Sequence, residues 1–139
     1  MAAFVKFEAF SEHLAEKVHD LNADTLRVYL SNTAPDVAAD VVKADLAEIA
    51  GGNGYTANGE DTQNSTSRSG GTTSVVGVDI VWTASGGAIA TFRYSVLYND
   101  TPTSPTDPLL GYWDYGSSIT LAAGETFTTD FGASILTVS

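Results

Sequence analysis

The chain of 139 residues contains no cysteine, which removes whole classes of stabilising and reactive sites. Without cysteine, neither a disulfide framework nor a thiolate metal site can form, and no thiol nucleophile is available. Nothing of this kind ties the chain to an oxidising compartment. We expect stability to come from packing or from binding partners.

Basic residues are also scarce, with six lysines and arginines against seventeen aspartates and glutamates and a formal net charge of -11. This balance opposes approach to the phosphate backbone of a nucleic acid or to an anionic membrane. We therefore expect neither nucleic acid nor membrane among the partners. The same charge keeps a protein soluble at high concentration, and it is complementary to a basic partner surface.

Long apolar runs are missing as well. No stretch of about 18 apolar residues, the length of a membrane-spanning helix, occurs in the sequence. The N-terminal residues MAAFVKFEAF lack the basic and long apolar segments of a secretory signal. We expect a soluble chain without a targeting segment.

What the sequence does contain is typical of a globular protein, because 43% of the residues are apolar and 17% are charged. A chain of this length buries roughly two thirds of the surface of its unfolded state. We expect a single domain over residues 1–139.

Residues 81–121 hold half of the aromatic side chains and form the expected centre of a sheet. Phe92, Tyr94, Val96 and Tyr98 alternate with smaller or polar residues, which predicts a strand with one apolar face. The segment TPTSPTDP at 101–108 cannot continue a ladder, because proline lacks the amide donor. We expect residues 109–115 to return as an antiparallel neighbour.

Residues 7–21 predict a single amphipathic helix, because their apolar side chains recur at steps of three and four. The apolar positions are Phe7, Phe10, Leu14, Val18 and Leu21. On one continuous helix His13 and His19 would point about 120° apart, so they are poorly placed to share a metal. We expect both to be surface histidines.

Alternating and β-branched segments elsewhere predict further strands at 25–30, 75–83, 119–121, 126–129 and 135–138, with a turn at 116–118. Residues 41–50 predict a short helical turn. Residues 51–73 are rich in Gly, Ser, Thr and Asn, and we expect an exposed flexible loop or a loosely twisted pair of strands. The fold class is therefore mainly β, an antiparallel β-sandwich or barrel with one N-terminal amphipathic helix.

Catalytic patterns are lacking. The two histidines have no sequence neighbour typical of a catalytic set, and no serine lies in a G-x-S-x-G nucleophile elbow. The Gly51-Gly52 region lacks the GK[ST] of a phosphate-binding loop. We expect a protein that is not an enzyme and has no cofactor.

Two stretches are candidate interaction surfaces. Asn99, Asp100 and Asp107 flank the proline-rich segment and could offer oxygen ligands to calcium, although such residues commonly bond their own backbone in turns. The run GYWDYG at 111–116 could stack on a sugar through its rings. Alternation puts Tyr112 on the side of Asp114 and opposite Trp113, so we expect at least one of these rings in the core.

Several segments resemble a family of small virion structural proteins of tailed bacteriophages. They are F-x-x-x-L-A-E-K-V-H-x-L at 10–21, DTLRVYLSNTAP at 24–35, EIAGGNGYTANG at 48–59, WTASGG at 82–87, FRYSVLYND at 92–100 and LLGYWDYGSSITLAAGETF at 109–127. The resemblance covers nearly the whole chain. Its motifs are structural, and no catalytic residue is carried over with them.

The resemblance implies a capsid decoration or cement protein with a jelly-roll-like sandwich. Such a protein would bind the major capsid protein on the outer surface of the virion, after assembly in the host cytoplasm. Unpaired sandwich edges and the repetition of particle components also predict a homo-dimer or trimer. The alternative is a carbohydrate-binding or fibre- or tail-associated virion module.

Overall fold

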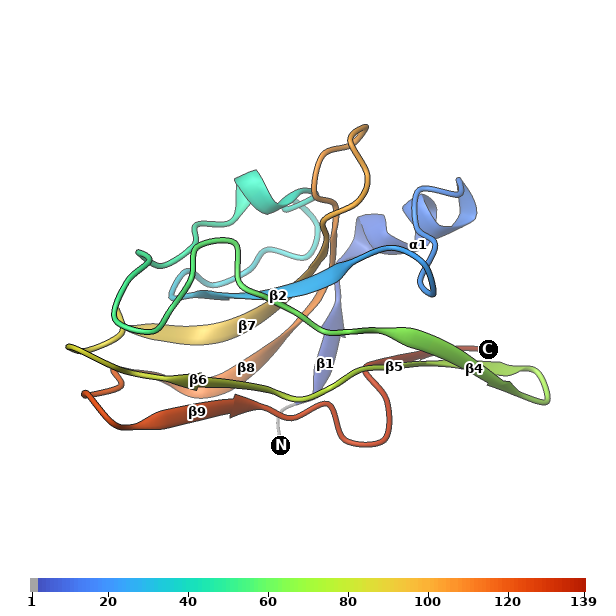
Figure 1. The fold of residues 1–139 in the computed structure, drawn as a ribbon. Coiled ribbons are helices and arrows are strands. Elements are labelled where there is room, and N and C mark those ends of the chain that lie inside the picture. Colours follow the sequence, from blue (N-terminus) through green and yellow to red (C-terminus); the bar gives the residue numbers. More distant parts are fainter. Residues whose placement is uncertain (1–2) are drawn as a thin grey trace.

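A computed structural model describes residues 3–139 as a mainly antiparallel β protein with one short α-helix near the N-terminus (Figure 1). In chain order the elements are β1 (Phe4–Lys6), α1 (Glu8–Ala15), β2 (Leu26–Ser31), the 3-10 turn η1 (Lys43–Asp45), β3 (Glu60–Asp61), β4 (Ser65–Ser69), β5 (Thr72–Val76), β6 (Ile80–Thr83), β7 (Phe92–Asn99), β8 (Leu109–Ile119), β9 (Thr126–Thr129) and β10 (Leu136–Val138). The predicted fold class is confirmed. The jelly-roll-like arrangement stays a prediction.

The strands form a five-stranded sheet in the order β1-β8-β7-β2-β3, a three-stranded sheet β10-β5-β4 and a two-stranded sheet β6-β9. In Figure 1 the strands β2 and β7 of the five-stranded sheet lie above β6 and β9. The main apolar cluster joins Leu26 and Leu97 of the large sheet to Trp82 of β6 and Leu136 of β10. The core therefore lies between the large sheet and the two smaller ones, as in a sandwich.

β7 is the most completely buried strand. It pairs antiparallel with β2 on one side and with β8 on the other, which confirms the predicted return of the chain after the proline-rich segment. As the alternation predicts, Val96 and Tyr98 share one face and belong to the second cluster, whereas Leu97 lies on the opposite face and belongs to the main cluster. A register shift between Phe92 and Tyr94 places these two rings in different clusters.

The second cluster lies on the outer face of the large sheet and is covered by the segment between β2 and β3. Leu46 from this segment packs with Tyr29 and Tyr98, and the Tyr29 hydroxyl donates to the Leu46 carbonyl at 3.1 Å. Lys43 Nζ lies 4.9 Å from the centre of the Tyr29 ring and 2.8 Å from a carboxylate oxygen of Glu48. The predicted helical turn in 41–50 is present as η1.

The helix is shorter than predicted. α1 ends at Ala15 instead of continuing to residue 21, and Lys17 adopts a left-handed backbone with φ 66. The Val18 amide then donates to the His13 carbonyl at 2.9 Å, which closes the turn. Turning here lets His19 and Leu21 pack into the fold, and this tertiary burial outweighs the helical periodicity.

Two predicted strand boundaries are also wrong. Residues 75–83 form β5 and β6 with a break at 77–79. At this break Gly77 approaches its neighbours closely, since a Cβ there would lie 2.7 Å from Ile135 Cδ1 and 2.9 Å from the Thr62 carbonyl oxygen. Residues 109–119 form the single strand β8. The predicted turn at 116–118 is an irregularity within this strand, where Gly116 has φ 101.

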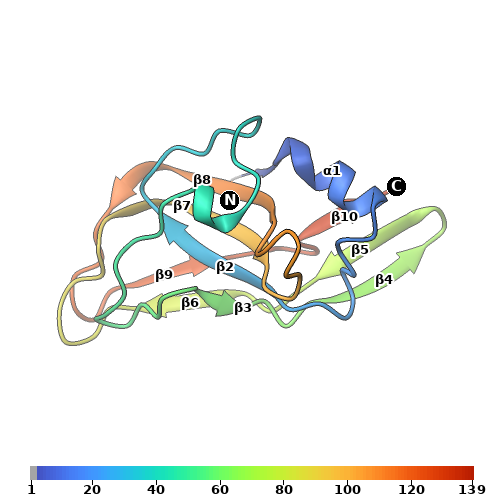
Figure 2. The same cartoon turned by 90° about the horizontal axis from the view of Figure 1, so that it is seen from above.

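The segment 51–73 is more ordered than an exposed loop. It contains β3 and β4, and β4 pairs with β5 as a hairpin that extends beyond the sandwich in both views (Figures 1 and 2). Tyr55 is buried, and its hydroxyl donates to Glu48 at 2.6 Å while it accepts from the Leu30 amide at 3.1 Å. The alternative expectation, a pair of strands, is therefore correct for residues 65–76.

Replacing Trp82 by alanine should cost about 3–5 kcal/mol of unfolding free energy, because large aromatic side chains leave cavities in a packed core. Trp82 is 2% exposed and stacks on Phe127 with ring centres 6.2 Å apart. The matched control is Val81→Ala, since the neighbouring Val81 is 56% exposed and should change stability by only about 0.5 kcal/mol. Denaturant unfolding measures both, and equal midpoints for the two variants would contradict the packing described here.

Candidate ligand-binding groove

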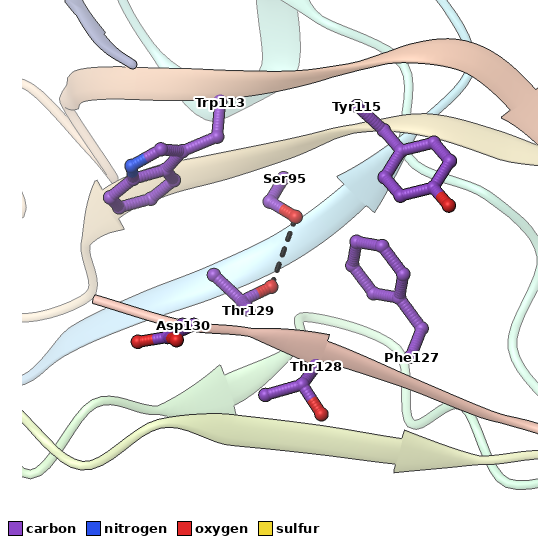
Figure 3. Close-up of a pocket in the computed structure, with 7 residues that line it drawn as sticks. All are labelled: Ser95, Trp113, Tyr115, Phe127, Thr128, Thr129 and Asp130. Carbon is purple, nitrogen blue, oxygen red and sulfur yellow. Dashed lines mark hydrogen bonds between the residues drawn. The ribbon is translucent and has the colours of Figure 1, made fainter. Parts of the chain in front are cut away.

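A groove with a volume of about 250 Å³ opens between β8 of the large sheet and β9 of the two-stranded sheet (Figure 3). Its lining residues come from β7, β8, β9 and the residue that follows β9. They are Ser95, Trp113, Tyr115, Phe127, Thr128, Thr129 and Asp130.

Strand alternation explains why rings gather here. Trp113 and Tyr115 are two residues apart on β8 and share one face, and Phe127 has the same relation to Thr129 on β9. β1 pairs with β8 only as far as Trp113, so this side of β8 has no neighbouring strand beyond that residue in the described chain. Among residues 3–139, no strand pairs with this part of the edge of β8.

Two small side chains form the floor of the groove. Ser95 Oγ and Thr129 Oγ1 lie 3.0 Å apart and are buried, and Figure 3 shows their hydrogen bond between the rings of Trp113 and Tyr115. Because each hydroxyl has a partner, the pair meets the requirement that buried polar groups be bonded. The small size of both side chains leaves space that larger apolar side chains would fill.

The aromatic walls are fixed by packing against other rings. Tyr115 is 55% exposed, and its ring meets Phe127 edge to face at 5.5 Å. Phe127 in turn stacks on Trp82 and meets Phe92 at 4.9 Å. Trp113, at the other end, packs on Phe131 with ring centres 5.5 Å apart. The groove is preformed, as most small-molecule sites are.

The structure places the aromatic residues of the GYWDYG run on two different faces of β8. Trp113 is 8% exposed, which confirms the expectation that one ring of the GYWDYG run lies in the core. Tyr112 lies on the opposite face, half-buried against Phe7 and Tyr94, and does not line the groove. Tyr115 belongs to the same run and lines the groove with Trp113, as its two-residue spacing from that residue indicates.

Asp114 of β8, also predicted as part of an interaction surface, is bonded to Arg93 of the neighbouring strand β7. Its carboxylate accepts two hydrogen bonds from Arg93, from Nε at 2.8 Å and from Nη2 at 3.1 Å, and a third from the Gly116 amide at 2.8 Å. The bond to Arg93 holds the pKa of Asp114 below its usual value. Its acceptor sites are largely used within the chain.

Of the three candidate calcium ligands, Asp100 and Asp107 lie near one another, whereas Asn99 is turned into the fold. Asn99 is buried, donates to His19 Nδ1 at 3.0 Å, and accepts from the Thr101 amide at 3.1 Å as a turn residue does. Asp100 bonds Arg27 Nε at 3.0 Å. Burial, followed by the charge of Asp100, raises the pKa of Asp107. Residues 3–139 contain no group of three or more His, Asp or Glu side chains that could hold a metal ion.

The expectation of surface histidines is wrong. His13 and His19 are both buried, with ring centres 6.0 Å apart, because the chain turns at Lys17 and brings the second ring back over the first. His13 Nδ1 and His19 Nε2 have no hydrogen-bond partner among the described residues. Burial, and then the neighbouring His13, lower the pKa of His19 to about 4, although Asp24 acts in the opposite direction.

Comparisons with known proteins give no relative: no protein-family model, curated protein or solved structure matches this chain. In the part of the chain that the structure describes, no helix has the length and apolar character needed to cross a membrane.

Acidification should destabilise the fold through His19. Its pKa is lowered from 6.5 in the unfolded chain to about 4 in the fold, so the unfolded state binds the proton more tightly. The stability due to a neutral His19 is therefore complete above pH 6.5 and is lost as the pH falls toward 4. Unfolding free energy measured across this window should have a steeper slope in the unmodified protein than in His19→Phe. Equal slopes would contradict the assignment, and carboxylate titration, which the two proteins share, cancels in the comparison.

Proposed function

We propose that this protein is a non-enzymatic structural component of a bacteriophage virion that binds the major capsid protein on the outside of the assembled head and stabilises it. The observation that carries the proposal is the resemblance of its segments to small virion proteins of tailed phages. Those segments include the whole of β2, β7 and β8, the three strands at the middle of the large sheet. The resemblance therefore involves the residues that determine the fold.

The distribution of charge supports a protein partner over packaged DNA. Three basic side chains are engaged in ion pairs within the described chain, Arg27 with Asp100, Lys43 with Glu48 and Arg93 with Asp114. Only six basic residues stand against seventeen acidic ones, so the remaining surface is strongly acidic. Such a surface is complementary to a basic patch on a capsid and repels a phosphate backbone.

The free strand edges support repeated copies on the shell. β3 and β1 end the large sheet, and β4 ends the three-stranded sheet in the hairpin that extends beyond the sandwich. Unpaired edges invite pairing with another chain, and virion components repeat by symmetry. These features favour the proposed homo-dimer or trimer.

Phage heads that carry the protein should withstand higher temperatures than heads that lack it. A partner that binds the assembled shell but not its free subunits raises the apparent stability by mass action. The measurement is the rupture temperature of both preparations, together with the position of the protein in a particle map. Re-addition of purified protein to bare heads should restore the higher temperature. Density confined to the tail or to a fibre, or identical rupture temperatures, would exclude the capsid role.

The salt dependence of the protein's attachment to the capsid should distinguish a charged docking surface from an apolar one. If the acidic surface docks on basic capsid residues, raising salt from ~0.05 to ~0.5 M should release the protein, because exposed charges are screened over a Debye length of roughly 10 Å at 0.1 M. The fraction bound after sedimentation of the heads gives the answer. Retention at high salt would indicate an apolar docking surface instead.

A further inference from the structure

We propose that the groove between β8 and β9 binds an uncharged saccharide, with one sugar ring against Tyr115 and Phe127 and its hydroxyls directed to the polar side chains of the groove. This activity is separate from attachment to a capsid and does not depend on it.

The size of the groove matches a small ring. At about 250 Å³ it is just smaller than the clefts of roughly 300–1,000 Å³ that hold drug-sized ligands. One sugar ring fits such a volume, while the rest of an oligosaccharide can extend into solvent past the exposed side chain of Tyr115.

The exposed ring of Tyr115 points to a ligand with apolar C–H groups. More than half of this side chain is exposed, yet it packs on Phe127 and lies at the mouth of a concave surface. The face of an aromatic ring carries negative electrostatic potential, which attracts the weakly positive C–H groups on the face of a sugar ring. Figure 3 shows the Tyr115 and Phe127 rings together at one end of the groove and Trp113 at the other.

Polar groups for the sugar hydroxyls lie among the rings. The Ser95–Thr129 pair shares one hydrogen bond, so one of its two hydroxyl protons is still available to donate. Asp130 Oδ1 accepts from the Gly132 amide at 2.8 Å, which fixes the carboxylate beside the groove. A carboxylate is acceptor-only and suits a ligand rich in hydroxyl donors. Few placed polar groups within apolar walls are typical of a selective small-molecule site.

Charge excludes acidic ligands. Among the described residues that line the groove there is no lysine or arginine, Asp130 adds a negative charge, and the chain as a whole carries -11. Phosphorylated, sialylated or uronic sugars would meet repulsion without a compensating cation. An uncharged saccharide keeps the ring contacts and the hydrogen bonds and avoids this cost.

A peptide fits less well. The usual way for a peptide to bind such an edge is to add a strand, which needs a regular row of backbone donors and acceptors. Next to Tyr115 the edge of β8 is irregular, because Gly116 has φ 101 and the pairing with β7 shifts between Asp114 and Ile119. The groove therefore favours a ligand held by side chains.

The test uses the purified full-length protein on an array of neutral and acidic glycans. The affinity of the best neutral glycan is then measured by titration while tryptophan emission is followed. We expect binding of at least one neutral glycan, weakened at least tenfold in Tyr115→Ala. The matched control is Val81→Ala, because Val81 is as exposed as Tyr115, at 56% against 55%, but lies outside the groove. It should bind with unchanged affinity, and thermal melts of both variants check that the fold is kept.

A second variant tests whether the Ser95–Thr129 hydroxyl pair at the floor of the groove contributes to binding. Thr129→Val keeps the shape of the side chain but removes a hydroxyl, so it should also weaken binding while Trp113 and Tyr115 stay in place. The proposal is overturned if no neutral glycan binds, if Tyr115→Ala binds as well as the unmodified protein, or if acidic glycans or extended peptides bind better. Because all measurements use the free protein, a negative result leaves the proposed capsid role unaffected.

Discussion

The antiparallel pairing of β7 with both β2 and β8 is the constraint on which the rest of the structure depends. Both edges of β7 are occupied and both of its faces are covered, so it has contacts with the main cluster below and the second cluster above. A slip of one residue would turn every side chain of this strand to the opposite face and move its residues out of both clusters. The position of β8, and with it the groove, follows from this fixed register.

Local patterns were sufficient to predict individual strands. The alternation of β7 and the proline-rich break before β8 predicted the sheet centre, because both signals are local. The end of α1 could not be predicted in the same way. His19 is buried beside Asn99, 80 residues away, and only the assembled sheet supplies that partner. The irregularity at Gly116 likewise depends on pairing between strands.

Individual residues of the candidate sites were easier to recognise than their partners. Alternation correctly placed Trp113 and Tyr112 on opposite faces, and Trp113 is the ring that meets the expectation of at least one in the core. The groove combines this residue with Phe127 and Thr129 from a different sheet, and nothing in the sequence indicates that these strands face each other. Asp114 was predicted to belong to an interaction surface. Its bond to Arg93 could not be foreseen, because it joins neighbouring strands whose register is shifted.

The exposed residues of the groove also bear on how the sequence of such a protein can vary. Tyr115, Thr128 and Asp130 are exposed, and none belongs to either apolar cluster. Substitutions at such positions usually change stability by no more than about 0.5 kcal/mol. Chains that retain the doubly paired strand could therefore exchange these three side chains freely. Recognition could change within a lineage while the scaffold that presents it stays the same.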